Sequence, residues 1–148
     1  MTPDWPWPES LDALAAAPAQ HRVLFENAHV RMLDTRINPG QRTPVHTHRW
    51  PAAHYIVSWS DFVRRDADGT VLLDTRKTDR ASVGTPEALW GDALPPHSLE
   101  NVGTVPLHII STEVKSAATR QQAADREVSG SKKDGPGRLR IAERPARP

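Results

Sequence analysis

From Arg22 onward, apolar and polar residues alternate in short runs that are separated by turn residues. A period of two places successive side chains on opposite faces of an extended chain, so each run predicts a half-buried β-strand. Such runs cover residues 21–27, 30–37, 54–59, 61–66, 70–76 and 107–114. The intervening turn residues are Asn38-Pro39-Gly40, Asp68-Gly69 and Val102-Gly103-Thr104. Because no helical pattern lies between the runs, the sequence predicts an all-β protein, either a sandwich or a barrel.

The two ends of the chain have different patterns. Residues 9–20 predict a short helix with Ser10 as its N-cap, which Pro18 ends, and residues 116–128 predict a second helix. From Ser129 the chain has almost no apolar side chains, so we expect it to be disordered. The sequence therefore divides into an N-terminal arm with a short helix (1–21), a barrel (22–115) and a C-terminal helix with a basic tail (116–148).

Composition limits the possible chemistry. A chain of 148 residues is long enough for one domain, and the absence of cysteine excludes a disulfide framework and a thiolate metal site.

Residues 116–148 carry eight Lys or Arg against four Asp or Glu, a net charge of +4, and the rest of the chain has a net charge of −3. Nucleic-acid binding is not expected, because the tail lacks aromatic residues and the barrel is acidic. Without a signal-peptide pattern or a membrane-spanning apolar run, the expected location is cytoplasmic.

Three histidines form the strongest candidate for a functional site. His46 and His48 are separated by one residue, so in a strand their side chains point the same way and can converge on one metal ion. Such a pair needs a third ligand from another strand, because His-x-His alone is often structural. His97, which follows two prolines and opens another predicted strand, is the candidate for that ligand.

These residues resemble the two sequence motifs of the cupin family. Gly40 to His48 matches the Gly-x5-His-x-His opening of the first motif, and His97 to Asn101 matches the His-x3-Asn end of the second. The resemblance spans about residues 22–115. It implies a small double-stranded β-helix barrel, commonly a homodimer, with a divalent metal held by His46, His48 and His97.

The chain departs from this pattern where the first motif usually supplies a glutamate. Ala52 and Ala53 stand at those places, and neither can bind a metal. His54 lies one position further, so strand alternation turns it away from the metal unless a bulge shifts the register; it is a possible extra ligand. A neutral three-histidine site favours Fe, Zn, Ni, Mn or Cu over Mg or Ca. An empty barrel is the alternative, because a missing carboxylate weakens the site.

Other residues are candidates for the walls of a pocket. Trp50 and Trp90 flank the two motifs and could line a substrate pocket or simply fill the barrel. Tyr55 is two residues beyond Ala53, so strand alternation places both on the same face. We therefore expect Tyr55 to face the lumen, as the acid or base nearest to the metal site. Arg64-Arg65 places one guanidinium on each face of its strand, so either one of them faces an anionic substrate or both are solvated. The remaining histidines outside the motifs are expected to be structural: His21, His29 and His108.

The leading hypothesis is a metal-binding cupin that coordinates a small polar or anionic molecule. If it is an enzyme, its carboxylate-free histidine set resembles that of cupin dioxygenases that use Fe(II). One alternative is a metal-assisted isomerase or lyase that acts on a sugar-like substrate. The other is a non-catalytic module that binds a ligand or a protein subunit, because one fold serves many functions.

Overall fold

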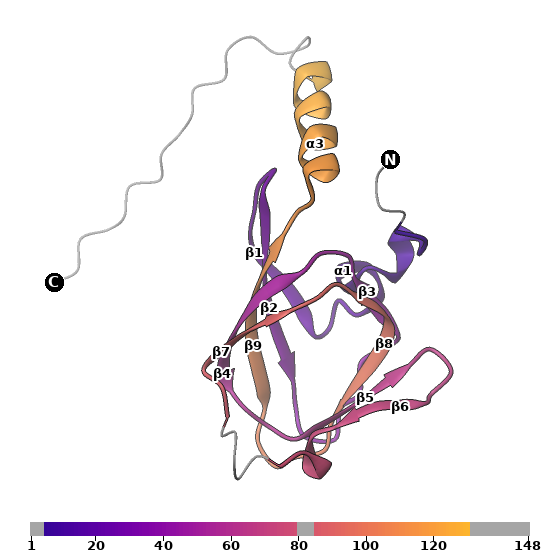
Figure 1. Cartoon of the computed structure of the whole chain (residues 1–148), viewed down its shortest axis with the longest axis vertical. Coiled ribbons are helices and arrows are strands. Elements are labelled where there is room, and N and C mark those ends of the chain that lie inside the picture. The colour runs from indigo at the N-terminus through magenta and orange to yellow at the C-terminus, as the bar shows by residue number, and fades with distance from the viewer. Residues whose placement is uncertain (1–4, 80–84, 131–148) are drawn as a thin grey trace, which may run out of the picture.

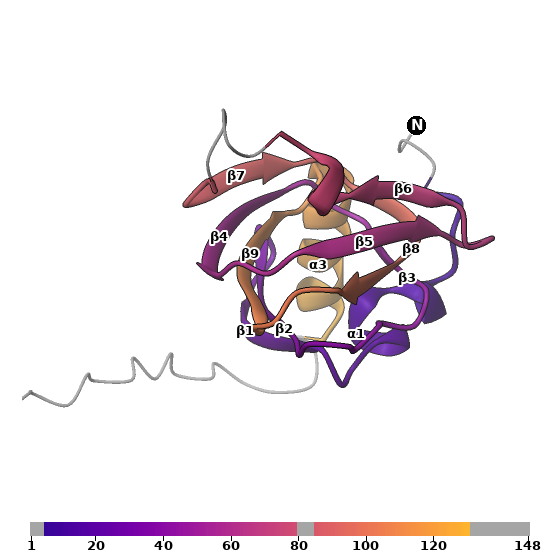
Figure 2. The same ribbon diagram turned by 90° about the horizontal axis from the view of Figure 1, so that it is seen from below.

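The computed structural model describes residues 5–79 and 85–130, which form two antiparallel sheets (Figures 1 and 2). The five-stranded sheet runs in the order β1 (His21–Glu26), β2 (Val30–Ile37), β9 (Leu107–Val114), β4 (Ala52–Ser58) and β7 (Ala88–Gly91). The four-stranded sheet runs in the order β3 (His46–His48), β8 (Leu94–Asn101), β5 (Phe62–Asp66) and β6 (Val71–Asp74). Figure 2 shows the two sheets facing each other around a common interior. The predicted double-stranded β-helix barrel is confirmed.

The strands differ from the prediction mainly around the second motif. Strand β7 was not predicted, because the four-residue segment Ala88–Gly91 is too short to show alternation. Strand β8 begins at Leu94 rather than at His97, and it includes both prolines that precede this histidine. Its pairing with β3 joins His46 to His97 and His48 to Leu94, with an irregularity between the two pairs. Such irregularities accommodate prolines, which cannot donate to the ladder.

Two predicted turns are present and use glycine for its backbone freedom. Gly69, in the turn between β5 and β6, has φ +90°, and Gly40 has φ +80°. The Gln41 N–H donates to the Asn38 carbonyl at 2.9 Å, which closes the Asn38-Pro39-Gly40 turn. Proline followed by glycine at positive φ is the pattern of a type II turn. This turn leads the chain from β2 in one sheet toward β3 in the other.

The N-terminal segment packs against the barrel as two short turns rather than one helix. These are a 3₁₀ turn, η1 (Glu9–Leu11), and α1 (Ala13–Ala16). The predicted Ser10 cap is wrong, because the side chain of Asp12 caps α1 by accepting from the Leu14 N–H at 3.1 Å. Ala13 and Ala17 are fully buried, and α1 contacts both β1 and β3. This segment therefore closes the end of the barrel where β1 and β3 begin.

Asn101 fixes the far end of β8. Its side chain is fully buried and donates to the carbonyls of Ile37 and Val105 at 2.7 and 2.9 Å. Its Oδ1 accepts from the Gly103 N–H and from the Ser60 hydroxyl at 2.9 and 2.8 Å. The second motif thus ends in a structural amide whose donors and acceptor are all satisfied.

Two other helical elements lie in the described ranges, and Thr75 in the first of them is buried and lines the interior. They are the 3₁₀ turn η2 (Thr75–Lys77) and the C-terminal helix α3 (Ala117–Gly130), close to the predicted helix at 116–128. Figure 1 shows α3 standing away from the barrel. The part of the predicted disordered tail at 131–148 lies outside the described residues. No helix in the described ranges has the length and apolar character that crossing a membrane requires.

Candidate metal centre

Four imidazoles meet at the end of the barrel that α1 covers. His46 and His48 come from β3 and His97 from β8, and their ring centroids lie 4.4 to 5.7 Å apart. The fourth is His21 at the start of β1, whose ring lies 4.8 Å from that of His46 and 5.3 Å from that of His48. Potential ligand atoms of His21, His46 and His48 all lie within 4.8 Å of one another. The structure therefore adds His21, expected to be only structural; this group of close ligand atoms does not include His97, the predicted third ligand, although the His97 ring lies 4.4 Å from that of His46.

The same nitrogen anchors each of the four rings. The Nδ1 atoms of His46, His97 and His21 lie 2.8, 2.8 and 3.0 Å from the backbone carbonyls of Pro44, Pro95 and Ala17. A carbonyl oxygen can only accept, so each of these Nδ1 atoms carries the proton. In a neutral imidazole, the lone pair then lies on Nε2, the nitrogen available to a metal.

His48 is oriented by a carboxylate instead of a carbonyl. Its Nδ1 lies 3.0 Å from Oε1 of Glu113, which is fully buried on β9. The other carboxylate oxygen, Oε2, accepts from Nε of Arg31. Arg31 in turn donates from both terminal nitrogens to Asp12, at 3.0 and 2.9 Å. This chain of contacts links the N-terminal cap to the histidine cluster and sets the tautomer of His48.

The strand register shows why Glu113 occupies this place. Glu113 pairs with Ala52 on one side and with Arg31 on the other, and cross-strand partners share a face of the sheet. Ala52 stands where the motif usually has a glutamate, so the carboxylate comes from the neighbouring strand. Its two oxygens contact His48 and Arg31, and Glu113 is not in the group of close ligand atoms, so it orients a histidine. Sequence reasoning missed it, although a glutamate at an inward position of the 107–114 run was a visible signal.

Burial keeps the cluster neutral. Burial, followed by the neighbouring His48 and His46, lowers the pKa of His21 to about 3. Burial and then His46 and His48 lower the pKa of His97 to about 2, and burial and then His46 lower that of His48 to about 3. Burial raises the pKa of the Glu113 carboxyl, and the Arg31 guanidinium opposes that shift. The imidazoles are therefore in the neutral form, in which one ring nitrogen carries a proton and the other is free to bind a metal.

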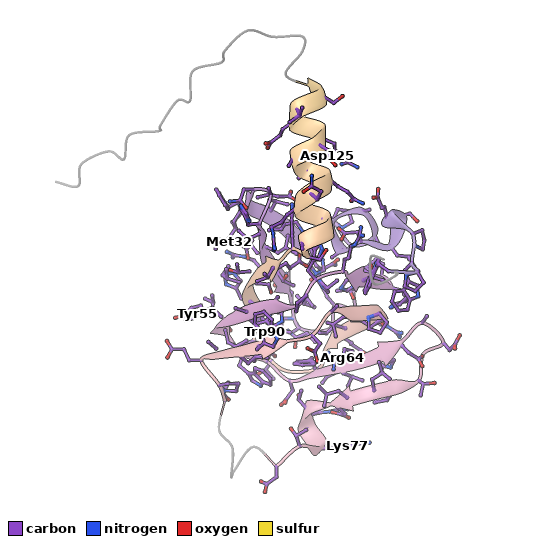
Figure 3. All side chains as sticks on the ribbon, turned by 45° about the horizontal axis from the view of Figure 1, so that its top comes forward. Met32, Tyr55, Arg64, Lys77, Trp90 and Asp125 are labelled. Carbon is purple, nitrogen blue, oxygen red and sulfur yellow. The ribbon has the colours of Figure 1, made fainter. Side chains whose placement is uncertain are left out.

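The faces of β4 are the reverse of those predicted. His54 lines the interior and its Nδ1 lies 2.8 Å from the Ser111 hydroxyl, whereas Tyr55 is 50 % exposed and Figure 3 shows it at the outer surface. The prediction of Tyr55 as a lumen-facing acid or base is wrong. The turn between β3 and β4 breaks the alternation that was counted through it, and Ala52 rather than Ala53 faces inward. His54 lies in the cavity and, like His97, is outside the group of three close ligand atoms.

The two predicted pocket tryptophans have different positions. Trp50 does not line the cavity, because its ring packs under the guanidinium of Arg31, 5.0 Å away, and its Nε1 donates to Thr119. The pocket prediction for Trp50 is therefore wrong. Trp90 does line the cavity, at a position that leaves 58 % of the residue exposed.

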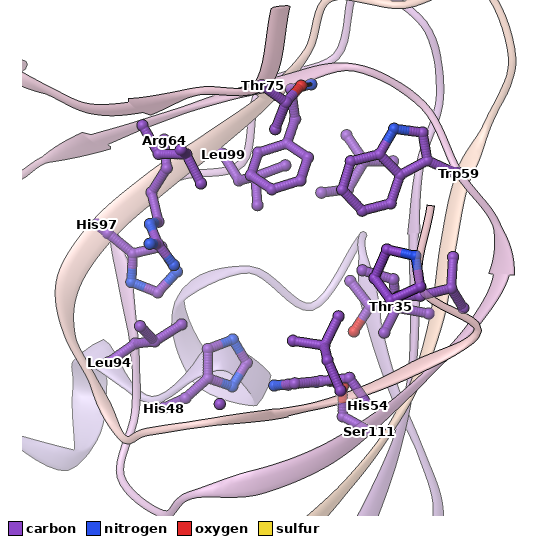
Figure 4. Close-up of a pocket in the computed structure, with 18 of the residues that line it drawn as sticks. Thr35, His48, His54, Trp59, Arg64, Thr75, Leu94, His97, Leu99 and Ser111 are labelled. Carbon is purple, nitrogen blue, oxygen red and sulfur yellow. Dashed lines mark hydrogen bonds between the residues drawn. The ribbon is translucent and has the colours of Figure 1, made fainter. Parts of the chain in front are cut away.

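The histidine cluster opens into a cavity of about 780 Å³ (Figure 4). His48, His97 and Arg64 lie together on one side of it, and Trp59 lies on another. Most of the remaining wall is apolar; it includes Ile37, Ile56, Phe62, Leu73, Leu94, Leu99 and Ile109. A cavity of this size and character can hold a small organic molecule beside the imidazoles.

Comparison with known proteins gives likenesses of fold only. No family model matches the chain, and no curated protein matches it. Among solved structures, a cupin domain from Bordetella pertussis is 16 % identical, with a TM-score of 0.48 over 65 % of this chain and 92 % of that one. A double-stranded β-helix protein from Klebsiella pneumoniae is 17 % identical, with a TM-score of 0.46 over 66 % and 77 %. A polyketide cyclase from Streptomyces resistomycificus is 16 % identical, with a TM-score of 0.42 over 64 % and 63 %.

Proposed function

We propose that this barrel binds one divalent transition metal through His46, His48 and His97, with His21 as a fourth imidazole. The observation that carries the proposal is the shared anchoring of the four rings, each through Nδ1. An acceptor on Nδ1 leaves the Nε2 lone pair to a metal, which is the arrangement that metal-binding histidines require. Fe, Zn, Ni, Mn and Cu all accept imidazole ligands, so the donor set fits a metal without choosing among them.

The second part of the proposal is that the metal centre holds a small polar or anionic molecule taken from the cavity. A bound metal would supply positive charge and open coordination positions beside the cavity. The chain itself supports this role in three ways: the imidazoles are preoriented, Glu113 holds His48 in one tautomer, and the mostly apolar wall can contact an organic ligand.

The structure changes the balance among the possible activities. An isomerase or lyase needs a group that moves a proton; Tyr55, the residue expected to do this, lies outside the cavity, which leaves the neighbouring His54 as the candidate. An oxygen-dependent reaction at Fe(II) makes no such demand on the chain, because the protein supplies geometry and a dry pocket. We therefore keep a dioxygenase activity as the first activity to test, with a non-catalytic ligand-binding cupin as the alternative. A homodimer and a cytoplasmic location complete the proposal.

The experiment that tests metal binding is elemental analysis of the full-length chain after loading with each of the five metals. The wild type should hold about one metal per chain, and the His46→Ala/His48→Ala variant should hold almost none. His29→Ala is the matched control, because His29 is exposed in the turn between β1 and β2. Wild-type protein that takes up no metal under any loading condition would overturn the proposal.

His21→Ala tests the fourth ligand separately. With Co(II) as the probe, loss of an imidazole changes the visible absorption spectrum even if the metal is still bound. We expect a changed spectrum and weaker binding in this variant. A spectrum and an affinity equal to those of the wild type would remove His21 from the ligand set.

A further inference from the structure

Arg64 is a half-buried cation with no counter-ion among the residues that the structure describes. It lines the cavity, and its Nε is buried with no hydrogen-bond partner. Within the described residues no carboxylate forms an ion pair with it, and burial lowers the pKa of its guanidinium. Arginine nevertheless stays charged in proteins, so a negative partner from elsewhere would stabilise this group.

The neighbouring arginine on the same strand shows the contrast. Arg65 donates from Nη1 to Oε2 of Glu100 at 2.6 Å, on the opposite face of β5. The two guanidiniums are thus one residue apart, with one paired to a carboxylate and the other facing the cavity. The sequence left open whether one of them points inward, and the structure identifies Arg64 as that residue.

The sheet register places Arg64 beside the histidine cluster. Arg64 pairs with Leu99 across β5 and β8, and His97 is two residues further along β8 on the same face. Diagonal neighbours of this kind lie about 7–8 Å apart, within reach of a long side chain. Figure 4 shows the Arg64 side chain directed toward the His97 ring. A small anion could therefore contact Arg64 while the rest of its molecule lies next to the imidazoles.

The remaining walls limit the kind of anion. Arg64 is the only Lys or Arg among the described lining residues, and most of the others are apolar. The acidic and exposed Asp92 also lines the cavity, so additional negative charge on a ligand would be repelled there. A molecule with one negative charge and an apolar body fits these walls, whereas a sugar phosphate or a polycarboxylate does not.

We propose that the cavity takes a small organic monocarboxylate, whose carboxylate is bound by Arg64 and whose apolar body lies among Ile56, Phe62 and Ile109. A guanidinium presents parallel N–H groups that match a carboxylate, and the low polarity of the wall strengthens this contact. The inference rests on the proposed function in that it names the class of molecule held at that site. Its key contact is made by the chain, so it can be measured with and without metal.

The test is isothermal titration of full-length protein with 3-phenylpropionate, octanoate and benzoate, and with 3-phenylpropanamide as the uncharged match. Wild-type protein should bind at least one acid, and 3-phenylpropionate should bind roughly 10- to 100-fold more tightly than its amide, the range expected for a charge-assisted contact. Arg64→Gln should remove that preference, and Arg64→Lys should restore it in part. Arg65→Gln is the control and should bind like the wild type.

Three results would overturn the proposal. They are no binding of any acid at millimolar concentration, equal binding of acid and amide by wild-type protein, and an unchanged preference in Arg64→Gln. Inorganic phosphate is the competing anion, and phosphate binding tighter than that of every acid would also overturn it. Thermal unfolding checks that Arg64→Gln is folded.

Metal content separates this proposal from the proposed function. Arg64→Gln should hold as much metal as the wild type, because Arg64 is not a ligand. Acid binding that persists in the His46→Ala/His48→Ala variant would support the carboxylate site when the metal site is absent. If the protein binds metal but no acid, the proposed metal site stands and only the inference about its ligand is overturned.

Discussion

Replacement of Glu113 by glutamine tests how far the cluster depends on its buried carboxylate. The substitution keeps the shape of the side chain but leaves only one oxygen to accept hydrogen bonds. In the wild type both oxygens accept, one from Arg31 Nε and the other from His48 Nδ1. The new amide NH₂ must therefore face one of these two donors, in a site that is 0 % exposed.

Each orientation of the amide has a predictable cost. If its nitrogen faces Arg31, two donors oppose each other, although Arg31 retains its paired contact with Asp12. If its nitrogen faces His48, the imidazole must move its proton to Nε2, which removes the lone pair that would bind a metal. Removal of one member of a buried ion pair costs about 3–5 kcal/mol. Because Asp12 still compensates the charge on Arg31, we expect a loss of about 3 kcal/mol in the free energy of unfolding.

The effect on metal binding is a second, independent readout. Loss of a partner that orients a ligand typically weakens metal binding by about 10- to 100-fold. Competitive zinc titration and urea unfolding of the metal-free protein measure the two quantities. Glu100→Gln is the matched control, since this glutamate pairs with Arg65 at a more exposed position and should change stability by less than about 1 kcal/mol. If Glu113→Gln binds zinc within twofold of the wild type and unfolds at the same urea concentration, the reasoning is refuted.

Three further predictions follow from the cluster and the fold. The unfolding free energy of metal-free protein should fall as pH drops from about 6.5 toward 3, by roughly 1 kcal/mol per pH unit for each strongly shifted imidazole. In the folded protein the pKa values of His21, His48 and His97 are about 3, 3 and 2, below the unfolded value of 6.5. The unfolded chain therefore binds more protons between pH 6.5 and 3. Equal stability at pH 5 and pH 7 in urea unfolding would contradict this. Asn101→Ala should lower the unfolding free energy by about 3 kcal/mol, because it removes the amide that donates to the carbonyls of Ile37 and Val105 and accepts from the Ser60 hydroxyl; a loss below about 1 kcal/mol would argue against the role assigned to this amide. Gly69→Ala should cost about 1–2 kcal/mol through its positive φ alone, since nothing lies within 4 Å of the added Cβ, and an unchanged melting temperature would show that the turn adapts.

Local patterns in the sequence were sufficient for the class of fold. Alternation with a period of two does not depend on distant residues, so most strands were found close to their observed limits. Turn residues were equally local, as at Gly69, where only the backbone conformation matters. The exceptions were β7, which is too short to show a period, and β8, where prolines lie inside a strand.

The candidate site was only partly predictable. His46, His48 and His97 were found because two of them share one short strand and the third follows a recognisable motif. Tyr55 was misplaced because inward and outward positions were assigned by alternation across the turn between β3 and β4. Alternation holds only within a continuous strand. Trp50 was misplaced because flanking a motif says nothing about the face on which a side chain packs.

The sequence by itself determined the alternation of the strands, the absence of thiolate ligands and the histidine pair on β3. Tertiary structure decided which distant groups join that pair. His21 reaches it because α1 folds back over the barrel end, and Glu113 reaches it because β9 lies next to β4, opposite Ala52. Arg64 faces the same cavity because β5 pairs with β8 in one register. These contacts depend on strand order and register, which arise from the packing of the whole chain and leave no local signal in the sequence.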